Sequence, residues 1–194
     1  MDTLLLKVVF TVFWLGAFLI RYPFAQKQKK NLIKSDRKTG EEKILLACAT
    51  LGMVLLPMLY VFTPLFSFAN YQLPVFLNLI GIALTVPTLW LFYRSHKDLG
   101  RNWSPTLEIR EEHQIVDWGV YKHIRHPMYT AIWLWVILQA LLLPNYISGL
   151  SGLVGFGLLY ALRVNKEEAM MLEQFGKPYA AYRTKTTRLI PFIF

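Results

Sequence analysis

Long apolar runs separated by charged segments dominate the chain. Five runs stand out, at residues 3–20, 44–62, 73–93, 128–143 and 146–162. A helix needs about 20 predominantly apolar residues to cross a bilayer, with roughly 17 as the lower limit. The first three runs reach that length, whereas the last two are short and are separated only by Pro144 and Asn145. We therefore predict an all-α polytopic membrane protein with about five transmembrane helices, of which the last two form a tight hairpin.

Composition and charge favour this interpretation over a buried hairpin in a soluble protein. The 194 residues are 55% hydrophobic with a mean hydropathy of +0.36, too apolar for an ordinary soluble domain. Apart from Lys7, all Lys and Arg residues lie in 21–43, 94–125 and 163–194. By the positive-inside rule, this alternation predicts an outside N-terminus and a cytoplasmic C-terminus. The membrane would be the cell membrane in a prokaryote and the endoplasmic reticulum in a eukaryote.

The same charge distribution limits the partners that the protein can have. The net charge of +9 is concentrated where anionic lipid and membrane topology favour it, so we expect a lipid bilayer as partner and no nucleic acid. The four histidines show no standard zinc spacing, and Cys48 is the only cysteine. We therefore expect no metal and no intramolecular disulfide.

The chain divides by composition into two regions. Residues 1–93 hold three predicted spans, and residues 94–194 hold a polar segment and the two-helix membrane hairpin. The 34 residues from 94 to 127 are too long for a plain connection, because loops beyond about 12 to 15 residues are usually functional or disordered. After the hairpin, residues 161–175 keep a helical composition while turning polar, and Gly176 with Pro178 is typical of a helix end.

Polar residues gather at the border of the last two apolar runs. Residues 125–129 read Arg-His-Pro-Met-Tyr before one run, and Arg163, Glu167 and Glu168 follow the other. Arg163 and Glu167 are four residues apart, so they share one face of a helix. An ordinary ion pair on the protein surface would also explain this spacing. Pro127 suits the first position of a helix, whose free N–H groups can receive an anion. Charged groups beside membrane spans predict a functional site.

Several blocks in this region resemble one family. These are Arg125-His126-Pro127-x-Tyr129, the preceding His113-Gln114-x-Val116-x-x-Gly119-x-Tyr121, the later Arg163-x-x-x-Glu167-Glu168, Phe175-Gly176-x-x-Tyr179-x-x-Tyr182, and the upstream Leu99-Gly100-x-x-Trp103-Ser104. Together they resemble the isoprenylcysteine carboxyl methyltransferase family over roughly residues 99–191, half of the chain. One departure is Ala131, where the family often has glycine.

This resemblance implies a membrane methyltransferase with a cytoplasmic cofactor pocket and no Rossmann domain. It would use S-adenosylmethionine, release S-adenosylhomocysteine, and methylate the carboxylate of a prenylated cysteine or a similar isoprenoid or lipid acceptor that enters from the membrane. By this resemblance Arg163 and Glu167 are the catalytic residues that face the acceptor. The cofactor would contact His113, Gln114, Val116, Gly119, Tyr121, His126, Pro127, Tyr129 and Glu168.

Physical chemistry suggests a role for each charged residue within this scheme. Arg163 would hold the acceptor carboxylate through its two-pronged guanidinium, which Glu167 would fix in place. Glu168 would accept hydrogen bonds from the ammonium or ribose hydroxyls of the cofactor. His126 and the backbone near Pro127 would hold the cofactor's carboxylate.

Three other functions share parts of this pattern. Similar C-terminal blocks occur in phospholipid N-methyltransferases, which would use the same cofactor but need an amine acceptor that Arg163 would repel. They also occur in NADPH-dependent membrane sterol reductases, which need a site for an extra phosphate and room for a sterol. A non-enzymatic membrane adaptor would bind no nucleotide-like cofactor.

Overall fold

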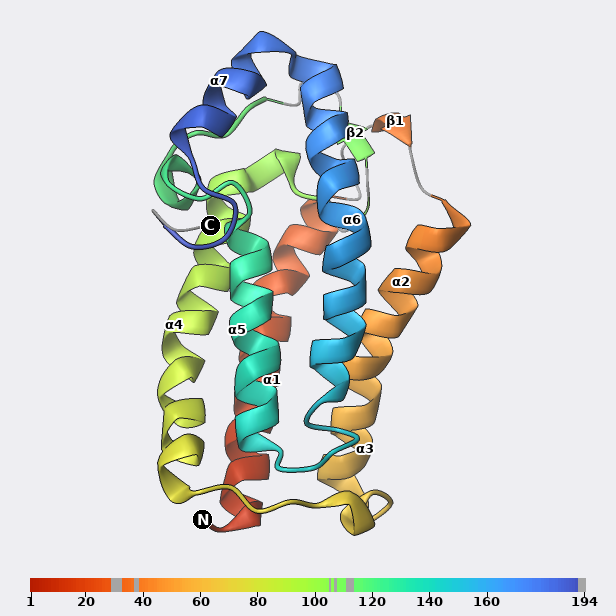
Figure 1. Cartoon of the computed structure of the whole chain (residues 1–194), viewed down its shortest axis with the longest axis vertical. Coiled ribbons are helices and arrows are strands. Elements are labelled where there is room, and N and C mark those ends of the chain that lie inside the picture. Colours follow the sequence, from red (N-terminus) through yellow and green to blue (C-terminus); the bar gives the residue numbers. More distant parts are fainter. Residues whose placement is uncertain (29–32, 37–38, 105, 107, 111–113, 192–194) are drawn as a thin grey trace.

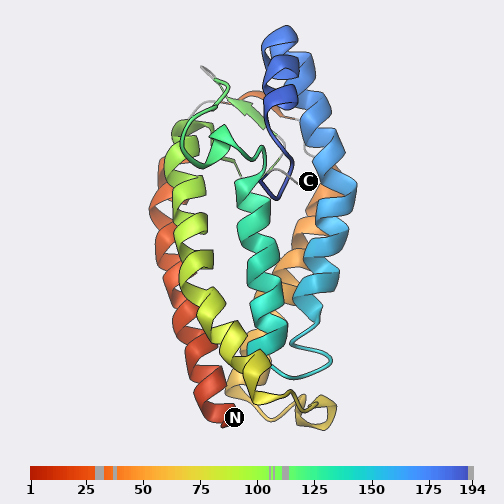
Figure 2. The same ribbon diagram turned by 60° about the vertical axis from the view of Figure 1, so that its left-hand side comes forward.

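The computed structural model describes residues 1–28, 33–36, 39–104, 106, 108–110 and 114–191. Long helices stand side by side, whereas α7 and two short strands gather at the end of the molecule opposite the N-terminus (Figures 1 and 2). The helices are α1 Thr3–Gln28, α2 Gly40–Thr50, α3 Leu56–Phe62, α4 Val75–Leu99, α5 Pro127–Leu142, α6 Ser151–Phe175 and α7 Lys177–Lys185. The strands are β1 Ile33–Asp36 and β2 Glu108–Arg110.

The first three predicted spans are confirmed as long apolar helices. Thr3–Gln28, Gly40–Phe62 and Val75–Leu99 contain 26, 23 and 25 residues and are each long and apolar enough to cross a membrane. The second of these joins α2 to α3 through a π-helical turn at Leu51–Leu55. The chain is therefore a multi-pass membrane protein. The hairpin helices α5 and α6 lie beside these three, and α5 is shorter, with 16 residues. Five spans remain a prediction.

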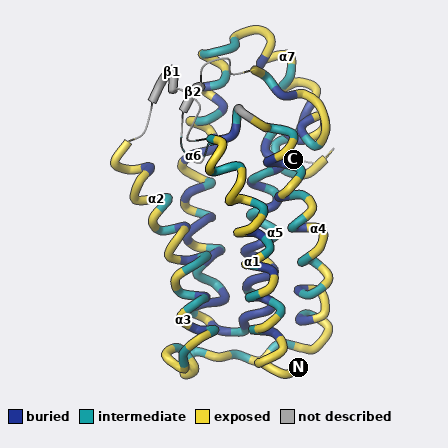
Figure 3. Tube along the Cα trace, turned by 180° about the vertical axis from the view of Figure 1, so that it is seen from behind, coloured by how far each residue is buried: buried dark blue, intermediate teal, exposed yellow. Residues whose placement is uncertain are grey.

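The outer faces of the long helices are apolar, as a helix in contact with lipid requires. Exposed side chains on α1 include Leu4, Val12 and Leu19, and those on α4 include Val86 and Trp90. The buried faces meet in a core around Phe10, Phe13, Tyr60, Phe92, Trp135 and Leu138. Figure 3 shows exposed positions alternating with buried ones along each helix.

The hairpin turn is longer than the sequence predicts. Helix α6 begins at Ser151 and not at residue 146, because the Asn145 side chain organises the intervening residues. Its Oδ1 accepts from the N–H groups of Ile147 and Ser148 at 3.1 and 2.9 Å, and its Nδ2 donates to the Phe66 carbonyl at 2.6 Å. The turn is thereby fastened to the segment that joins α3 to α4.

Helix α6 packs closely on the second span through glycine residues. A Cβ on Gly155 would come within 2.5 Å of the Cys48 carbonyl oxygen, and one on Gly52 within 2.3 Å of the Ser151 carbonyl oxygen. Nearby, the buried Gln139 donates to the carbonyls of Gly52 and Ser148 at 2.9 and 2.8 Å. Glycine therefore permits close helix packing at these positions.

Beyond the membrane helices, the polar segments are tied together. Strands β1 and β2 pair antiparallel, which joins the segment after α1 to the segment after α4. The polar extension of α6 ends at Gly176, whose φ of 57° places it in the left-handed region, as predicted. The N–H groups of Arg125 and His126 donate to the carbonyls of Thr187 and Arg188 at 2.8 and 3.1 Å, so the chain after α7 is fastened to the start of α5. Helix α4 continues across residue 93, where the composition changes.

Candidate functional site

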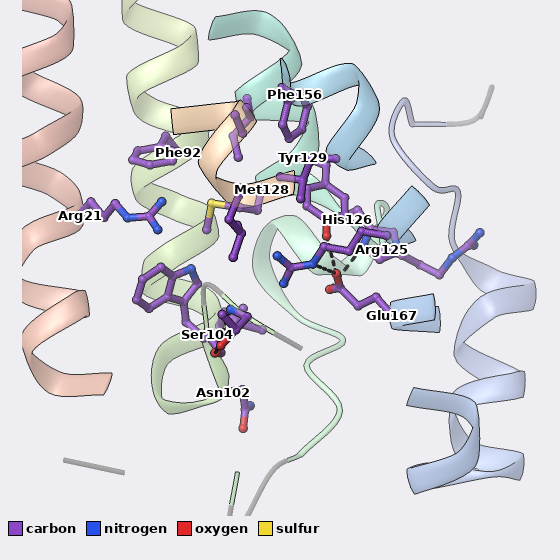
Figure 4. Close-up of a pocket in the computed structure, with 18 of the residues that line it drawn as sticks. Arg21, Phe92, Asn102, Ser104, Arg125, His126, Met128, Tyr129, Phe156 and Glu167 are labelled. Carbon is purple, nitrogen blue, oxygen red and sulfur yellow. Dashed lines mark hydrogen bonds and ion pairs between the residues drawn. The ribbon is translucent and has the colours of Figure 1, made fainter. Parts of the chain in front are cut away.

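A cavity of about 450 Å³ lies among α1, α2, α4, α5 and α6 at the polar end of these helices. One part of its wall is apolar and comes from membrane helices, with Trp14, Phe18 and Met53 among its residues. The other part is polar and includes Arg21, Asn102, Gln114, His126, Arg163 and Glu167. Figure 4 shows side chains from the polar segment and the membrane helices directed toward a common space. A ligand here would contact apolar and ionic groups together.

Arg163 is held between two carboxylates from different helices. It lies on α6 and is buried, with Nη1 3.4 Å from Glu42 Oε1 and Nε 3.7 Å from Glu167 Oε2. Glu42 belongs to the first turn of α2, where the Thr39 hydroxyl accepts from its N–H at 3.1 Å. The spacing of Arg163 and Glu167 along α6 thus gives the shared face that the sequence predicts. Glu42, which belongs to none of the sequence motifs, completes the arrangement.

Glu167 also connects to α5. The Tyr129 hydroxyl donates to Glu167 Oε2, and His126 Nδ1 lies 3.9 Å from Glu167 Oε1. The rings of His126 and Tyr129 are stacked with centroids 5.3 Å apart. The start of α5 and the polar part of α6 therefore meet at the cavity, as expected from the two motifs, and Glu167 is half-buried between them.

Glu168 does not line the cavity but lies behind His126. Its Oε1 accepts from His126 Nε2 at 3.1 Å, from Arg125 Nε at 3.2 Å and from Arg188 Nε at 3.2 Å. Arg188 Nη2 donates to the second oxygen at 3.0 Å. Burial would raise the pKa of this carboxyl, but the hydrogen bonds from His126, Arg188 and Arg125 hold it well below its usual range. Glu168 therefore anchors the imidazole and the chain after α7 as a carboxylate.

Gly119 also lies outside the cavity lining, and its contribution is to the backbone. Its φ is 59°, and a Cβ there would come within 2.1 Å of Asp98 Oδ2. That carboxylate accepts from the Val120 N–H at 3.0 Å and from Arg94 Nη2 at 3.2 Å. Gly119 thus lets the helical turn Gly119–Lys122 close against the end of α4.

The turn Gly119–Lys122 places Tyr121 at the cavity. Tyr121 is buried, its hydroxyl donates to the Ser95 carbonyl at 3.3 Å, and its carbonyl accepts from the Tyr182 hydroxyl at 2.7 Å. Gln114 and Val116 also line the cavity, and the Gln114 N–H donates to Asn102 Oδ1 at 3.2 Å. Pro127 occupies the first turn of α5 outside the lining. His113 lies outside the described residues.

Some residues that line the cavity are not predicted by the motifs. Arg21 lines it from α1, and a cation in or beside an apolar run is the signal that marks this residue. Glu42 lies outside the lining and reaches the site through its ion pair with Arg163. Trp103 and Asn102 also line the cavity, and they belong to the motif at residues 99–104, for which the sequence predicts no individual roles. Tyr179 and Tyr182 line the cavity from α7. Among the described residues no group of three or more His, Cys, Asp or Glu could hold a metal ion.

Comparison with known proteins identifies the family. The model described as isoprenylcysteine carboxyl methyltransferase (ICMT) family matches residues 79–173. Protein-S-isoprenylcysteine O-methyltransferase of Schizosaccharomyces pombe is 32% identical over 83 residues, covering 43% of this chain and 35% of that protein. Enzyme B of Arabidopsis thaliana is 31% identical over 96 residues, covering 48% and 49%. The human enzyme is 31% identical over 86 residues, covering 44% and 30%.

The fold agrees with that comparison. The solved structure of the eukaryotic intramembrane Ras methyltransferase ICMT matches with a TM-score of 0.59 and 23% identity, over 95% of this chain and 64% of the other. At that identity the match shows a shared fold. The sequence matches span between about a third and half the length of these curated relatives. Through residues 79–173, the chain belongs to the isoprenylcysteine carboxyl methyltransferase family.

Proposed function

We propose that this protein is an integral membrane methyltransferase that uses S-adenosylmethionine to methylate the carboxylate of a prenylated cysteine, or of a similar isoprenoid or lipid acceptor. The observation that carries the proposal is the composition of the cavity. Apart from Arg21, the polar residues named above lie within residues 79–173, which match the family model, and the apolar wall is built from membrane helices. A ligand with an apolar chain and a carboxylate fits such a space.

The residues of the polar wall suit a nucleoside-type cofactor. Asn102 and Gln114 offer amide groups, while Trp103, Tyr121 and Tyr179 offer aromatic surfaces. We propose that Gln114, Val116, Tyr121, His126 and Tyr129 contact the cofactor directly. His113 stays a proposed contact by resemblance. Gly119 and Pro127 would act through the backbone shape that they permit, and Glu168 would act by orienting His126.

The reaction needs little proton transfer. The cofactor supplies a methyl group bonded to a positively charged sulfur, and the acceptor carboxylate is negative, so the two charges cancel as methyl passes between them. An environment with few water molecules disfavours the separated charges more than the transition state. What remains is the alignment of carboxylate oxygen, methyl carbon and sulfur, and such positioning contributes about 7–11 kcal/mol to a reaction of this kind.

Arg163 and Glu167 remain the proposed catalytic residues. Their contacts with Glu42 and Tyr129 fix both side chains at the cavity before any ligand arrives. Preorganised groups stabilise a transition state without a further reorganisation cost. We further propose that residues 94–194 form the cofactor-binding and catalytic region, with residues 1–93 supplying the acceptor side of the cavity.

The distribution of basic residues supports a cytoplasmic location for the site. In sequence, nearly all Lys and Arg belong to residues 21–43, 94–125 and 163–191, and the described parts of these segments lie at the polar end of the bundle. The positive-inside rule places this end in the cytoplasm and the N-terminus outside. A cytoplasmic site would have direct access to the soluble cofactor, while the acceptor would reach it from the bilayer.

Calorimetric titration of the detergent-purified protein tests the cofactor directly. Micromolar binding of S-adenosylhomocysteine with no heat from NADPH would support a methyltransferase. Binding of NADPH alone would indicate a sterol-type reductase, and the absence of both would indicate an adaptor. Methyl transfer to an amine headgroup in place of N-acetyl-S-farnesyl-cysteine, a small prenyl thioether with a free carboxylate, would instead identify a phospholipid N-methyltransferase.

A further inference from the structure

Arg21 is an unassigned cation that faces the cavity. It lies on α1 among the apolar lining residues Trp14, Ala17 and Phe18. Figure 4 shows its guanidinium directed away from α1, into the pocket and toward Met128. The guanidinium carbon lies 5.1 Å from the centroid of the Trp103 ring. Within the described part of the chain, no Asp or Glu forms an ion pair with it.

The other arginines at this end of the cavity are already compensated. Arg163 lies between Glu42 and Glu167, while Arg125 and Arg188 both contact Glu168. An anion entering the cavity would therefore meet Arg163 as part of a group with two carboxylates and one guanidinium. Arg21 presents its positive charge without a carboxylate among the described residues. Charge complementarity thus directs an incoming anion to Arg21.

The surroundings of Arg21 hold it in position. Trp103 follows α4, and its ring lies 5.0 Å from that of His96, which in turn lies 4.5 Å from the Phe92 ring. His96 is fully buried, and its Nδ1 is 2.8 Å from the Phe92 carbonyl oxygen. This stack of rings forms a rigid surface under the guanidinium, and cation–π contact supplies part of the stabilisation that a carboxylate would otherwise give. The arginine is thus preorganised for a planar, two-pronged anion.

We propose that Arg21 binds the carboxylate of the methyl acceptor and thereby selects free acids over their esters and amides. The inference rests on the proposed function and assigns this task to Arg21, with Arg163 and Glu167 positioning the reacting groups. Arg21 shares its helix with part of the apolar wall, where an isoprenoid chain would lie, whereas the residues proposed to contact the cofactor directly lie between positions 114 and 129. The acceptor is therefore the carboxylate source that the geometry favours.

Binding of the acceptor carboxylate at Arg21 has a second consequence, which follows from the charge balance of the reaction. A carboxylate oxygen forms a bond to the methyl carbon while the carbon–sulfur bond breaks, and its electron pair stays on sulfur. The negative acceptor becomes a neutral ester, and the positive donor becomes a neutral thioether. The ester then loses its ionic attraction to Arg21, so the arginine binds substrate more tightly than product. Product release is favoured without any rearrangement of the protein.

The test compares Arg21→Gln with Lys27→Gln, which removes an exposed charge from the same helix outside the cavity. The acceptor is N-acetyl-S-farnesyl-cysteine, and its carboxamide serves as a competitive inhibitor. In Arg21→Gln we expect the acceptor KM to rise about 10- to 100-fold, the range for losing a hydrogen bond to a charged group. Inhibition by the carboxamide and the Kd of S-adenosylhomocysteine should change less than about twofold, as should every constant in Lys27→Gln. Arg21→Lys should fall between wild type and Arg21→Gln, because it keeps the charge but loses the fork.

Other outcomes would overturn this assignment. A raised Kd for S-adenosylhomocysteine in Arg21→Gln with an unchanged acceptor KM would place the cofactor's carboxylate at Arg21. Equal losses for acceptor and carboxamide in Arg21→Gln and Arg21→Lys would show that the side chain only shapes the cavity. The wild-type measurements separate this proposal from the proposed function, because a wild-type protein that binds no S-adenosylhomocysteine and transfers no methyl group contradicts the latter.

Discussion

The hydroxyl of Tyr129 donates a hydrogen bond to Glu167 Oε2 and joins the first turn of α5 to the polar extension of α6. The same carboxylate oxygen lies 3.7 Å from Arg163 Nε, so one tyrosine restrains the ion pair proposed to carry catalysis. The His126 ring stacked on Tyr129 extends the restraint toward Glu168. The two helices of the membrane hairpin thus share one hydrogen-bonded cluster beside the cavity.

Removing this hydroxyl should impair turnover more than folding. In Tyr129→Phe, Glu167 loses its donor while the ring contacts remain, so we expect kcat to fall about 10-fold, equivalent to about 1.4 kcal/mol of transition-state stabilisation. The melting temperature should change little. Tyr22→Phe, at an exposed position of α1, is the matched control and should leave both quantities unchanged. A kcat equal to that of wild type would exclude the restraint as a contribution to catalysis.

Neighbouring glutamates in the first turn of α2 give a comparison of a buried and an exposed ion pair. Glu42 is 4% exposed and pairs with Arg163, whereas Glu41 pairs with Lys166 at 2.7 Å with both side chains about half exposed. Glu42→Gln removes one of the two carboxylates beside a buried arginine and should destabilise the protein by about 3 kcal/mol. Glu41→Gln should cost about 0.5 kcal/mol or less, because exposed pairs contribute little.

Thermal unfolding of the two variants in the same detergent measures this difference. Glu42→Gln should also lower turnover. Arg163 would keep its contact with Glu167 on α6 but would lose its ion pair with the carboxylate on α2. Equal melting temperatures for Glu41→Gln and Glu42→Gln would mean that the pair with Arg163 does not fasten α2 to α6.

Glu168 should stay ionised between pH 5 and 8, so its protonation should not reduce the stability of the protein in this range. Its pKa lies below the ordinary carboxyl value of 4.5, so its contribution to stability is complete above about pH 4.5 and is lost only as the pH falls toward the lowered value. Glu168→Gln should weaken S-adenosylhomocysteine binding, because His126, Arg125 and Arg188 lose their shared anion. Glu173→Gln, exposed on the same helix, should bind as wild type does.

Titrations of S-adenosylhomocysteine at several pH values separate these effects. The ratio of the Glu168→Gln dissociation constant to that of wild type should be constant from pH 5 to 8. A ratio that approaches one as the pH falls within this range would show that the native carboxyl becomes protonated there, in conflict with the ion pairs that surround it.

The sequence predicts the membrane helices well because each one is encoded locally. The three long apolar runs become α1, α2–α3 and α4, and the spacing of Arg163 and Glu167 correctly places them on one face of α6. The start of α6 is predicted wrongly, because it depends on a side chain, Asn145, whose partners include the distant Phe66.

The cavity could be predicted only in part, because its wall is completed by contacts between distant segments. The motifs give Gln114, Tyr121, His126, Tyr129 and Glu167. Arg21 lines the cavity from α1, and Glu42 on α2 contacts Arg163 from outside the lining. Both come from helices outside the motifs, and no motif relates them to the site. The family resemblance implies that Glu168 contacts the cofactor. In the structure its carboxylate accepts hydrogen bonds from the guanidinium groups of Arg125 and Arg188.

Two glycines in the left-handed region allow backbone strain to be separated from steric exclusion. Gly100 and Gly119 have φ values of 55° and 59°, but nothing lies within 4 Å of a Cβ on Gly100, whereas a Cβ on Gly119 would meet the Asp98 carboxylate. Gly100→Ala should therefore cost about 1–3 kcal/mol, the strain of an L-residue held in a sparsely populated backbone conformation. Gly119→Ala should cost more and should also weaken S-adenosylhomocysteine binding, because Asp98 must release the Val120 N–H and the turn that carries Tyr121 must shift. Melting temperatures and dissociation constants of both variants test the difference. Equal effects on binding would mean that the contact with Asp98 does not position the turn.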